Sequence, residues 1–121
     1  MKTILVVDDS PTVVKMISDT LQFRGFKVIE AGNGFEALAK IDENEIDLVI
    51  VDLVMPIMNG LELIRSIRGK ERHKSTPIIL QTAQSQGDIQ QEAEVAGATG
   101  CIVKPFEPGQ LVSSVKKLLA H

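Results

Sequence analysis

The stretch that decides the fold is Asp47-Leu48-Val49-Ile50-Val51, followed directly by Asp52. The residues between the two aspartates are all apolar and do not alternate with polar ones. An unbroken apolar run of this kind is typical of a strand buried on both faces of a parallel sheet. We therefore expect a parallel sheet covered by helices on both sides, with an acidic residue at the end of one strand.

Four further strands are predicted on either side of this stretch, at residues 3–7, 27–31, 77–81 and 99–103. Between them the apolar residues follow the helical period, and helix start signals stand at the expected places. These signals are Ser10-Pro11, Asn59-Gly60, Asp88 and Glu107-Pro108, with stop signals at Gly25 and Gly97. Five alternating strands and helices with right-handed crossovers predict one doubly wound α/β domain over residues 1–121.

Composition excludes several classes of function. The net charge is -3 with no basic cluster, and the only aromatic residues are four phenylalanines, so direct nucleic-acid binding is not expected. No apolar run approaches the roughly 20 residues that span a membrane, and no secretion signal precedes the first strand. We expect a cytoplasmic protein without membrane insertion, in which the single Cys101 is a reduced, buried thiol.

Polar residues follow four of the predicted strands. Asp8 and Asp9 follow the first strand, Asp52 the third, Thr82 the fourth and Lys104 the fifth. In open parallel sheets, ligands bind outside the carboxyl ends of the strands. Two carboxylates about 4 Å apart repel by roughly 4 kcal/mol at an effective dielectric constant near 20, so a counterion is required. A Mg²⁺ ion, or Mn²⁺ in its place, suits these oxygen ligands, and Lys104 supplies a second positive charge.

This group of residues favours phosphoryl transfer. Asp52 can act as a carboxylate nucleophile, while Thr82 and Lys104 can bind the oxygens of the transferred group. Singly, Asp9 could be a helix cap, Thr82 a turn hydroxyl and Lys104 a solvated lysine. Their joint placement after four strands favours a common function. The two histidines lack metal-ligand spacing and are expected to be solvated: His73 in a charged stretch and His121 at the end of the chain.

The sequence resembles the receiver domains of bacterial two-component response regulators over essentially its whole length. The matching motifs are Val-Asp-Asp at 7–9, Val-Asp-Leu-Val-Met-Pro-Ile-Met-Asn-Gly at 51–60, Thr82-Ala83, Ala-Gly-Ala at 96–98 and Val-Lys-Pro-Phe at 103–106. The resemblance implies a flavodoxin-like (βα)5 fold with strand order 2-1-3-4-5. It also implies a stand-alone, chemotaxis-regulator-like signalling domain rather than an enzyme.

The resemblance implies a role for each site residue. Asp52 accepts a phosphoryl group from a sensor histidine kinase or a small phosphodonor, and the domain promotes its own phosphorylation and dephosphorylation. Asp9, Asp52 and the Val54 carbonyl bind Mg²⁺, with Asp8 acting through metal-bound water. Thr82 and Lys104 contact the phosphoryl group, and the Lys104-Pro105 bond is cis. A downstream protein then binds the face formed by the fourth helix, fifth strand and fifth helix.

Two departures from the family pattern bear on signalling. Cys101 stands where receivers usually carry an aromatic residue, so we expect the response to run through the loop after Thr82 and the fourth helix. That helix, at about residues 86–96, has a thin apolar stripe and is expected to pack loosely. Val54 and Gln84 occupy positions that tune dephosphorylation in the family, and we expect Gln84 to carry more of this tuning.

Two other functions remain as alternatives. A phosphatase of the haloacid dehalogenase type also uses an aspartate nucleophile and Mg²⁺, but its nucleophile follows the first strand in an Asp-x-Asp pattern that Asp8-Asp9-Ser10 lacks. A flavodoxin shares the fold but needs a hydroxyl-rich phosphate loop after the first strand, where Asp8 and Asp9 would repel the phosphate. The sequence leaves the output of the domain open.

Overall fold

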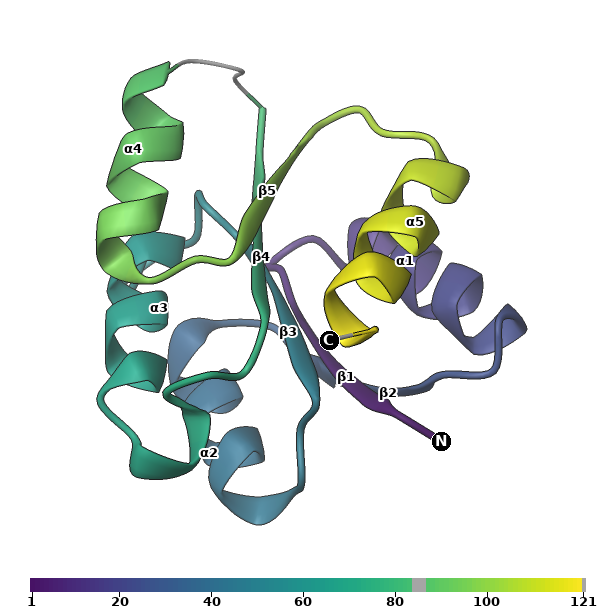
Figure 1. Ribbon diagram of the computed structural model, residues 1–121, viewed down its shortest axis with the longest axis horizontal. Coiled ribbons are helices and arrows are strands. Elements are labelled where there is room, and N and C mark those ends of the chain that lie inside the picture. The colour runs from purple at the N-terminus through teal and green to yellow at the C-terminus, as the bar shows by residue number, and fades with distance from the viewer. Residues whose placement is uncertain (84–86, 121) are drawn as a thin grey trace.

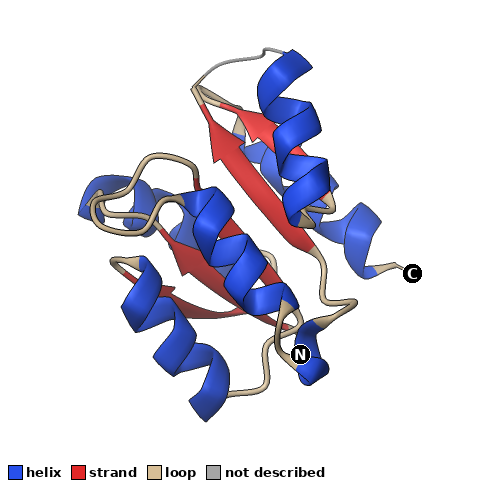
Figure 2. Ribbon diagram, turned by 90° about the vertical axis from the view of Figure 1, so that its left-hand side faces the viewer, coloured by secondary structure: helices blue, strands red, loops and turns tan. Residues whose placement is uncertain are grey.

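The computed structural model describes residues 1–83 and 87–120. The elements in chain order are β1 (Thr3–Val7), α1 (Pro11–Phe23), β2 (Lys27–Ala31), α2 (Gly34–Glu43), β3 (Leu48–Asp52), α3 (Gly60–Arg68), the short 3-10 helix η1 (Glu71–His73), β4 (Ile78–Thr82), α4 (Gly87–Ala96), β5 (Gly100–Val103) and α5 (Pro108–Leu119). The strands are parallel in the order β2-β1-β3-β4-β5, and their arrows point the same way in Figure 2. The predicted flavodoxin-like fold is confirmed.

Helices cover both faces of the sheet. Figure 1 shows α1 and α5 on one side of the strands and α2, α3 and α4 on the other. Alternate residues of β1 enter different cores: Ile4 and Val6 pack under α1 and α5, and Leu5 and Val7 pack under the other three helices. All residues of β3 and β4 are buried. The unbroken apolar runs are therefore explained by burial on both faces.

Two of the predicted helix starts, at Ser10 and Asn59, are held by side-chain caps. The Ser10 side chain accepts a hydrogen bond from the Val13 amide before α1. Asn59 and Glu62 form a reciprocal capping box at the start of α3, an arrangement that satisfies two of the otherwise unpaired amides of a first helical turn. The start of α2 was not predicted, and there the Asn33 side chain accepts from the Glu36 amide at 2.8 Å.

The strand boundaries differ slightly from the prediction. β3 and β4 each end one residue later than expected, because parallel pairing continues through Asp52 with Gln81 and through Thr82 with Val103. Asp52 and Thr82 are thus the last residues of their strands. The two predicted helix stops are confirmed, since Gly25 (φ 90°) and Gly97 (φ 114°) both adopt the left-handed backbone that glycine tolerates best.

The expectation that His73 is solvated is wrong. Its side chain is buried, with Nδ1 2.9 Å from the Thr76 hydroxyl oxygen. The tight turn of η1 explains the error, because Glu71 and Arg72 face solvent while the next residue turns inward. His121 lies outside the described residues.

Candidate functional site

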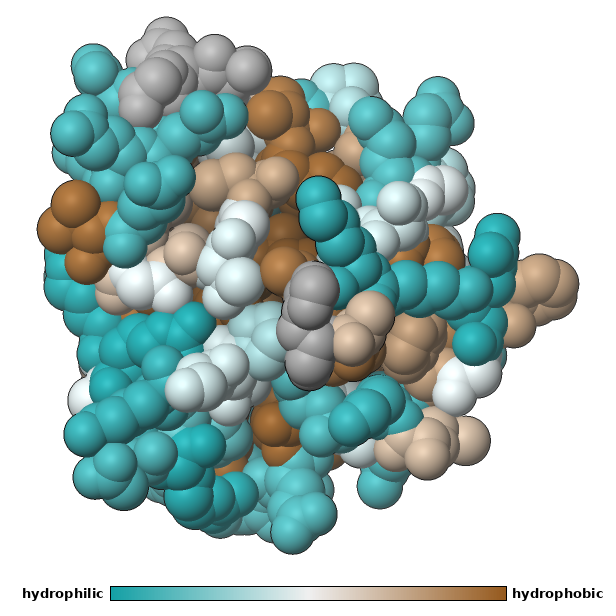
Figure 3. Space-filling model, viewed as in Figure 1, coloured by the Kyte–Doolittle hydropathy of each residue, from teal (hydrophilic) through white to brown (hydrophobic). Residues whose placement is uncertain are grey.

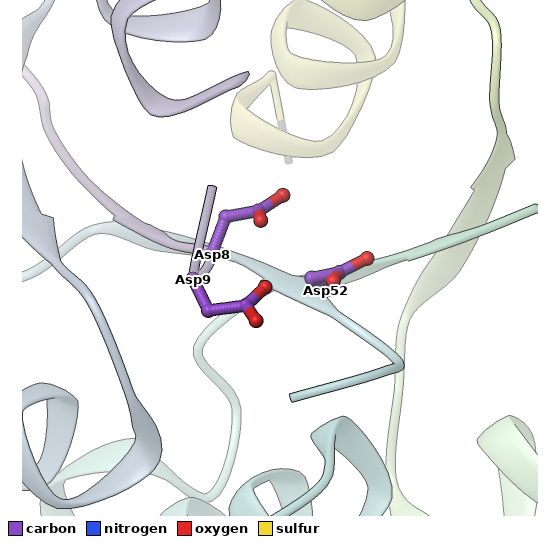
Figure 4. A group of neighbouring side chains, drawn as sticks. All are labelled: Asp8, Asp9 and Asp52. Carbon is purple, nitrogen blue, oxygen red and sulfur yellow. The ribbon is translucent and has the colours of Figure 1, made fainter. Parts of the chain in front are cut away.

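Three carboxylates meet where β1 and β3 end. Asp8 and Asp9 directly follow β1, and Asp52 is the last residue of β3. One carboxylate oxygen from each lies within 4.8 Å of the others, and Figure 4 shows the three side chains gathered at the strand ends. Asp8 and Asp52 are buried, whereas Asp9 is exposed. The predicted cluster therefore forms, with one member open to solvent.

Among the described residues, Lys104 is the basic side chain that contacts this cluster. Its Nζ lies 2.9 Å from Oδ1 of Asp52 and 3.4 Å from Oδ2 of Asp8. Burial alone would lower the pKa of Lys104, but the hydrogen bonds and charges of Asp52 and Asp8 outweigh it and the pKa is raised. The lysine is thereby held in its charged form.

One lysine does not balance three acids. Burial raises the pKa of Asp52 above its ordinary value; the Lys104 hydrogen bond opposes this, and the charges of Asp8 and Asp9 add to it. Ionising Asp52 therefore costs more in the protein alone than it does in water. An added cation would relieve that repulsion, and the donor atoms are all carboxylate oxygens, which suit a hard ion such as Mg²⁺ or Mn²⁺.

Asp8 accepts hydrogen bonds from two donors besides Lys104. Its Oδ1 accepts from the Ser10 amide at 2.9 Å, and its Oδ2 accepts from Nε2 of Gln81 at 3.5 Å. The sequence analysis had not singled out Gln81, which is fully buried on β4. Its signal in the sequence is a polar residue at the end of an otherwise apolar predicted strand.

The β3–α3 loop folds back tightly onto the end of β3. The Leu53 amide donates to the Gln81 carbonyl, and the Gly60 amide donates to the Leu53 carbonyl, both at 2.9 Å. A Cβ atom at Gly60 would collide with the Asp52 carbonyl oxygen, so only glycine fits this approach. Val54 is in this loop with its side chain exposed, and its carbonyl as a metal ligand stays a prediction.

Thr82 and Lys104 are joined through their backbones. Thr82 is buried at the end of β4, and its carbonyl accepts from the Lys104 amide at 2.7 Å. The Lys104–Pro105 peptide bond is cis, as the resemblance implied. The structure thus brings all of the predicted strand-end residues to one edge of the sheet.

The face around α4 and β5 is less polar at its centre than the acidic cluster is. Cys101 is half-buried rather than buried, and it packs against the core beneath α4. Burial, with the charge of Glu94, raises the pKa of its thiol. The thin apolar stripe of α4 is confirmed, because Ala93 and Ala96 are its buried residues among those described. Figure 3 shows hydrophobic side chains gathered over β5 between α4 and α5. Gln84 lies outside the described residues.

The chain matches known proteins over nearly all of its length. The family described as the response regulator receiver domain matches residues 4–116. The transcriptional regulatory protein ResD of Bacillus subtilis is 41% identical over 96% of this chain and 47% of its own length. The phosphate regulon regulatory protein PhoB of Pseudomonas aeruginosa is 36% identical over 98% of this chain and 52% of its own. The chain thus spans about half the length of these curated relatives.

Solved structures agree with the sequence relatives. The chemotaxis protein CheY4 of Vibrio cholerae has a TM-score of 0.95 at 39% identity, with 98% of each chain covered. The response regulator TrrA of Thermotoga maritima, solved in complex with Mg²⁺ and BeF, has a TM-score of 0.87 at 42% identity, covering 98% of this chain and 99% of TrrA.

Two further findings bear on the alternatives. Among the described residues, no helix is both long and apolar enough to cross a membrane. The family match gives no support to a haloacid dehalogenase phosphatase. With the strand order, the strand-end acids and the match over residues 4–116 taken together, this chain belongs to the response regulator receiver domain family.

Proposed function

We propose that Asp52 is the phosphoryl acceptor of this receiver domain and that the whole chain, residues 1–121, works as one phosphorylatable unit. The observation that carries the proposal is the Asp52 carboxylate at a strand end, 2.9 Å from Lys104 and within 4.8 Å of two other acids. A sensor histidine kinase or a small phosphodonor supplies the group. An Asp52 oxygen attacks phosphorus as the bond to the donor breaks, and the donor leaves with the electron pair.

The acidic cluster would hold a Mg²⁺ or Mn²⁺ ion. Asp9, Asp52 and the Val54 carbonyl are the proposed direct ligands, with Asp8 acting through metal-bound water. When bound, the ion offsets negative charge on the acids and on the phosphoryl oxygens. The oxygen-only donor set supports this assignment, as does the Mg²⁺ and BeF complex of the similar TrrA.

Lys104 and Thr82 are proposed to bind the phosphoryl group once it is on Asp52. Lys104 already lies on an Asp52 oxygen, so a short movement brings its Nζ to an oxygen of the new group. In this way the domain promotes its own phosphorylation and, with water as the acceptor, its dephosphorylation. Gln84 is proposed to tune the second reaction.

The output is proposed to be protein binding on the α4-β5-α5 face. The hydrophobic side chains over β5 in Figure 3 support a protein target there. This chain is proposed to control a downstream partner without binding nucleic acid directly, which its net charge of -3 and lack of a basic cluster support. A cytoplasmic location, where sensor kinases act, stays a prediction.

The test is phosphorylation by acetyl phosphate in Mg²⁺, followed by intact-protein mass spectrometry. Wild-type protein should gain the mass of one phosphoryl group, and Asp52→Asn should gain none because its amide oxygen is a poor nucleophile. Asp88→Asn removes an exposed acid on α4 and is the matched control. Labelling of Asp52→Asn to the wild-type level would show that another residue is the acceptor.

A further inference from the structure

Gln81 is a buried polar side chain that the proposed phosphoryl transfer does not use. It is 0% exposed and pairs with Asp52 on β3 and with Ile102 on β5. Because paired residues of a parallel sheet leave it on the same face, Gln81 points under α1 and α5. Its neighbours there, Ile79 and Ile102, belong to the apolar core. Packing alone does not explain a polar amide among these apolar side chains.

The hydrogen bonds of Gln81 are incomplete. Nε2 donates to Oδ2 of Asp8 at 3.5 Å, but Oε1 is buried and has no partner. Leaving such an acceptor unpaired costs stability, and an apolar side chain of the same shape avoids that cost. Gln81 therefore weakens the fold at this position while contacting one of the three acids.

Asp8 Oδ2 is shared between two donors of different kinds. Gln81 Nε2 approaches it from within the core at 3.5 Å, and Lys104 Nζ approaches it from the partly exposed side at 3.4 Å. Lys104 also bonds Asp52 at the shorter distance of 2.9 Å. If Lys104 moves to bind a phosphoryl group on Asp52, it leaves Oδ2 of Asp8. Among the described contacts, Gln81 is then the donor that still bonds this oxygen.

We propose that Gln81 is a positioning residue: its side-chain amide holds Asp8 in the orientation that serves the divalent cation, independently of Lys104. This inference rests on the proposed function. Without the amide, Oδ2 of Asp8 is left to Lys104 alone and is drawn toward it. The cation must then compete with the lysine for this acid. Residues that orient metal-binding side chains in this way commonly change metal affinity by about 10-fold or more when altered.

The experiment compares Mn²⁺ binding and thermal stability in Gln81→Met, which keeps the side-chain length and removes the amide. Free Mn²⁺ is counted by electron paramagnetic resonance, and the melting temperature is measured without metal. We expect the dissociation constant to rise about 10-fold while the melting temperature changes little, because removing the unpaired acceptor offsets the loss of the donor to Asp8. Gln91→Met, on the exposed surface of α4, is the matched control and should match wild type in both.

Any other outcome overturns either the positioning role of Gln81 or the proposed function. Unchanged Mn²⁺ binding in Gln81→Met overturns the positioning role, and so does weaker binding accompanied by a lower melting temperature, which marks a structural role. Wild-type protein that binds no Mn²⁺ contradicts the proposed function itself. If Gln81→Met does not fold, Mg²⁺ titration of wild-type protein decides by NMR: the Gln81 side-chain amide should shift with the same midpoint as the Ser10 amide. A Gln81 amide that does not move overturns the inference.

Discussion

Buried and partly buried polar side chains lie at both ends of the sheet, but the two groups find different partners. At the carboxyl ends, Asp8 and Asp52 share the single charge of Lys104. At the opposite end, Arg68 donates to the carbonyls of Gly97 and His73 at 2.9 and 2.7 Å. The first group is left with excess negative charge, whereas the second finds neutral backbone partners for its charge. Carboxylates with excess negative charge suit a cation, and a guanidinium that is hydrogen-bonded to carbonyls suits a structural tie.

The largest effect is expected when Lys104 is replaced by Met. Removing one partner of a buried ion pair costs about 3–5 kcal/mol, and because Lys104 is partly exposed we expect about 3 kcal/mol off the free energy of unfolding without metal. Urea unfolding followed by circular dichroism measures this loss. Mg²⁺ should restore part of it, because the ion replaces the missing positive charge.

Lys15→Met is the matched control for this substitution. Lys15 pairs with Asp19 at 3.1 Å, but both side chains are well exposed. Exposed pairs contribute at most about 1 kcal/mol, so this variant should stay close to wild type with or without Mg²⁺. Equal losses in the two lysine variants would contradict the assignment of excess charge to the site.

The next largest effect is expected at the opposite end, for Arg68→Met. Arg68 ties the end of α3 to the α4–β5 connection through the Gly97 carbonyl and the Thr99 hydroxyl. Losing these bonds and leaving partly buried carbonyls unpaired should lower the free energy of unfolding by about 2 kcal/mol. Arg65→Met, exposed on the same helix, is the control and should change little. Unlike the Lys104 variant, Arg68→Met should regain no free energy of unfolding when Mg²⁺ is added. Recovery of its stability in Mg²⁺ would contradict the distinction between the two ends of the sheet.

The same contrast explains what the sequence could predict. Asp52 was identifiable because an acid directly after an unbroken apolar strand has few harmless explanations, and the parallel sheet then brings Asp8 and Lys104 beside it. The tie made by Arg68 was not identifiable, because two of its partners are backbone carbonyls 5 and 29 residues away and the third is a hydroxyl 31 residues away. Gln81 lay within a predicted strand, but its contact with Asp8 spans 73 residues. The pattern of residues predicts the ends of β3 and β4 to within one residue, but it predicts side-chain partners poorly.

The smallest effect is expected from His73, as a dependence of stability on pH. Burial, with nearby positive charge from Arg72 and Lys70, lowers the pKa of His73 below its usual 6.5. The unfolded chain therefore takes up a proton near pH 6.5 while the folded protein does not. Stability from the neutral imidazole is full above pH 6.5 and is lost as the pH falls toward the folded-state pKa, by at most about 1.4 kcal/mol per pH unit.

His73→Asn tests this dependence, because asparagine keeps a polar atom near the Thr76 hydroxyl but does not titrate. Free energies of unfolding measured from pH 7.5 to 5.5 should fall less steeply for this variant than for wild type. Gln91→Met, which removes no titratable group, should keep the wild-type slope. His73→Asn does not alter the acidic cluster at the opposite edge of the sheet, so its Mn²⁺ binding at pH 7.5 should match that of wild type. Parallel slopes for His73→Asn and wild type would mean that His73 protonates as easily in the folded protein as in the unfolded chain, and its burial would then carry no electrostatic cost.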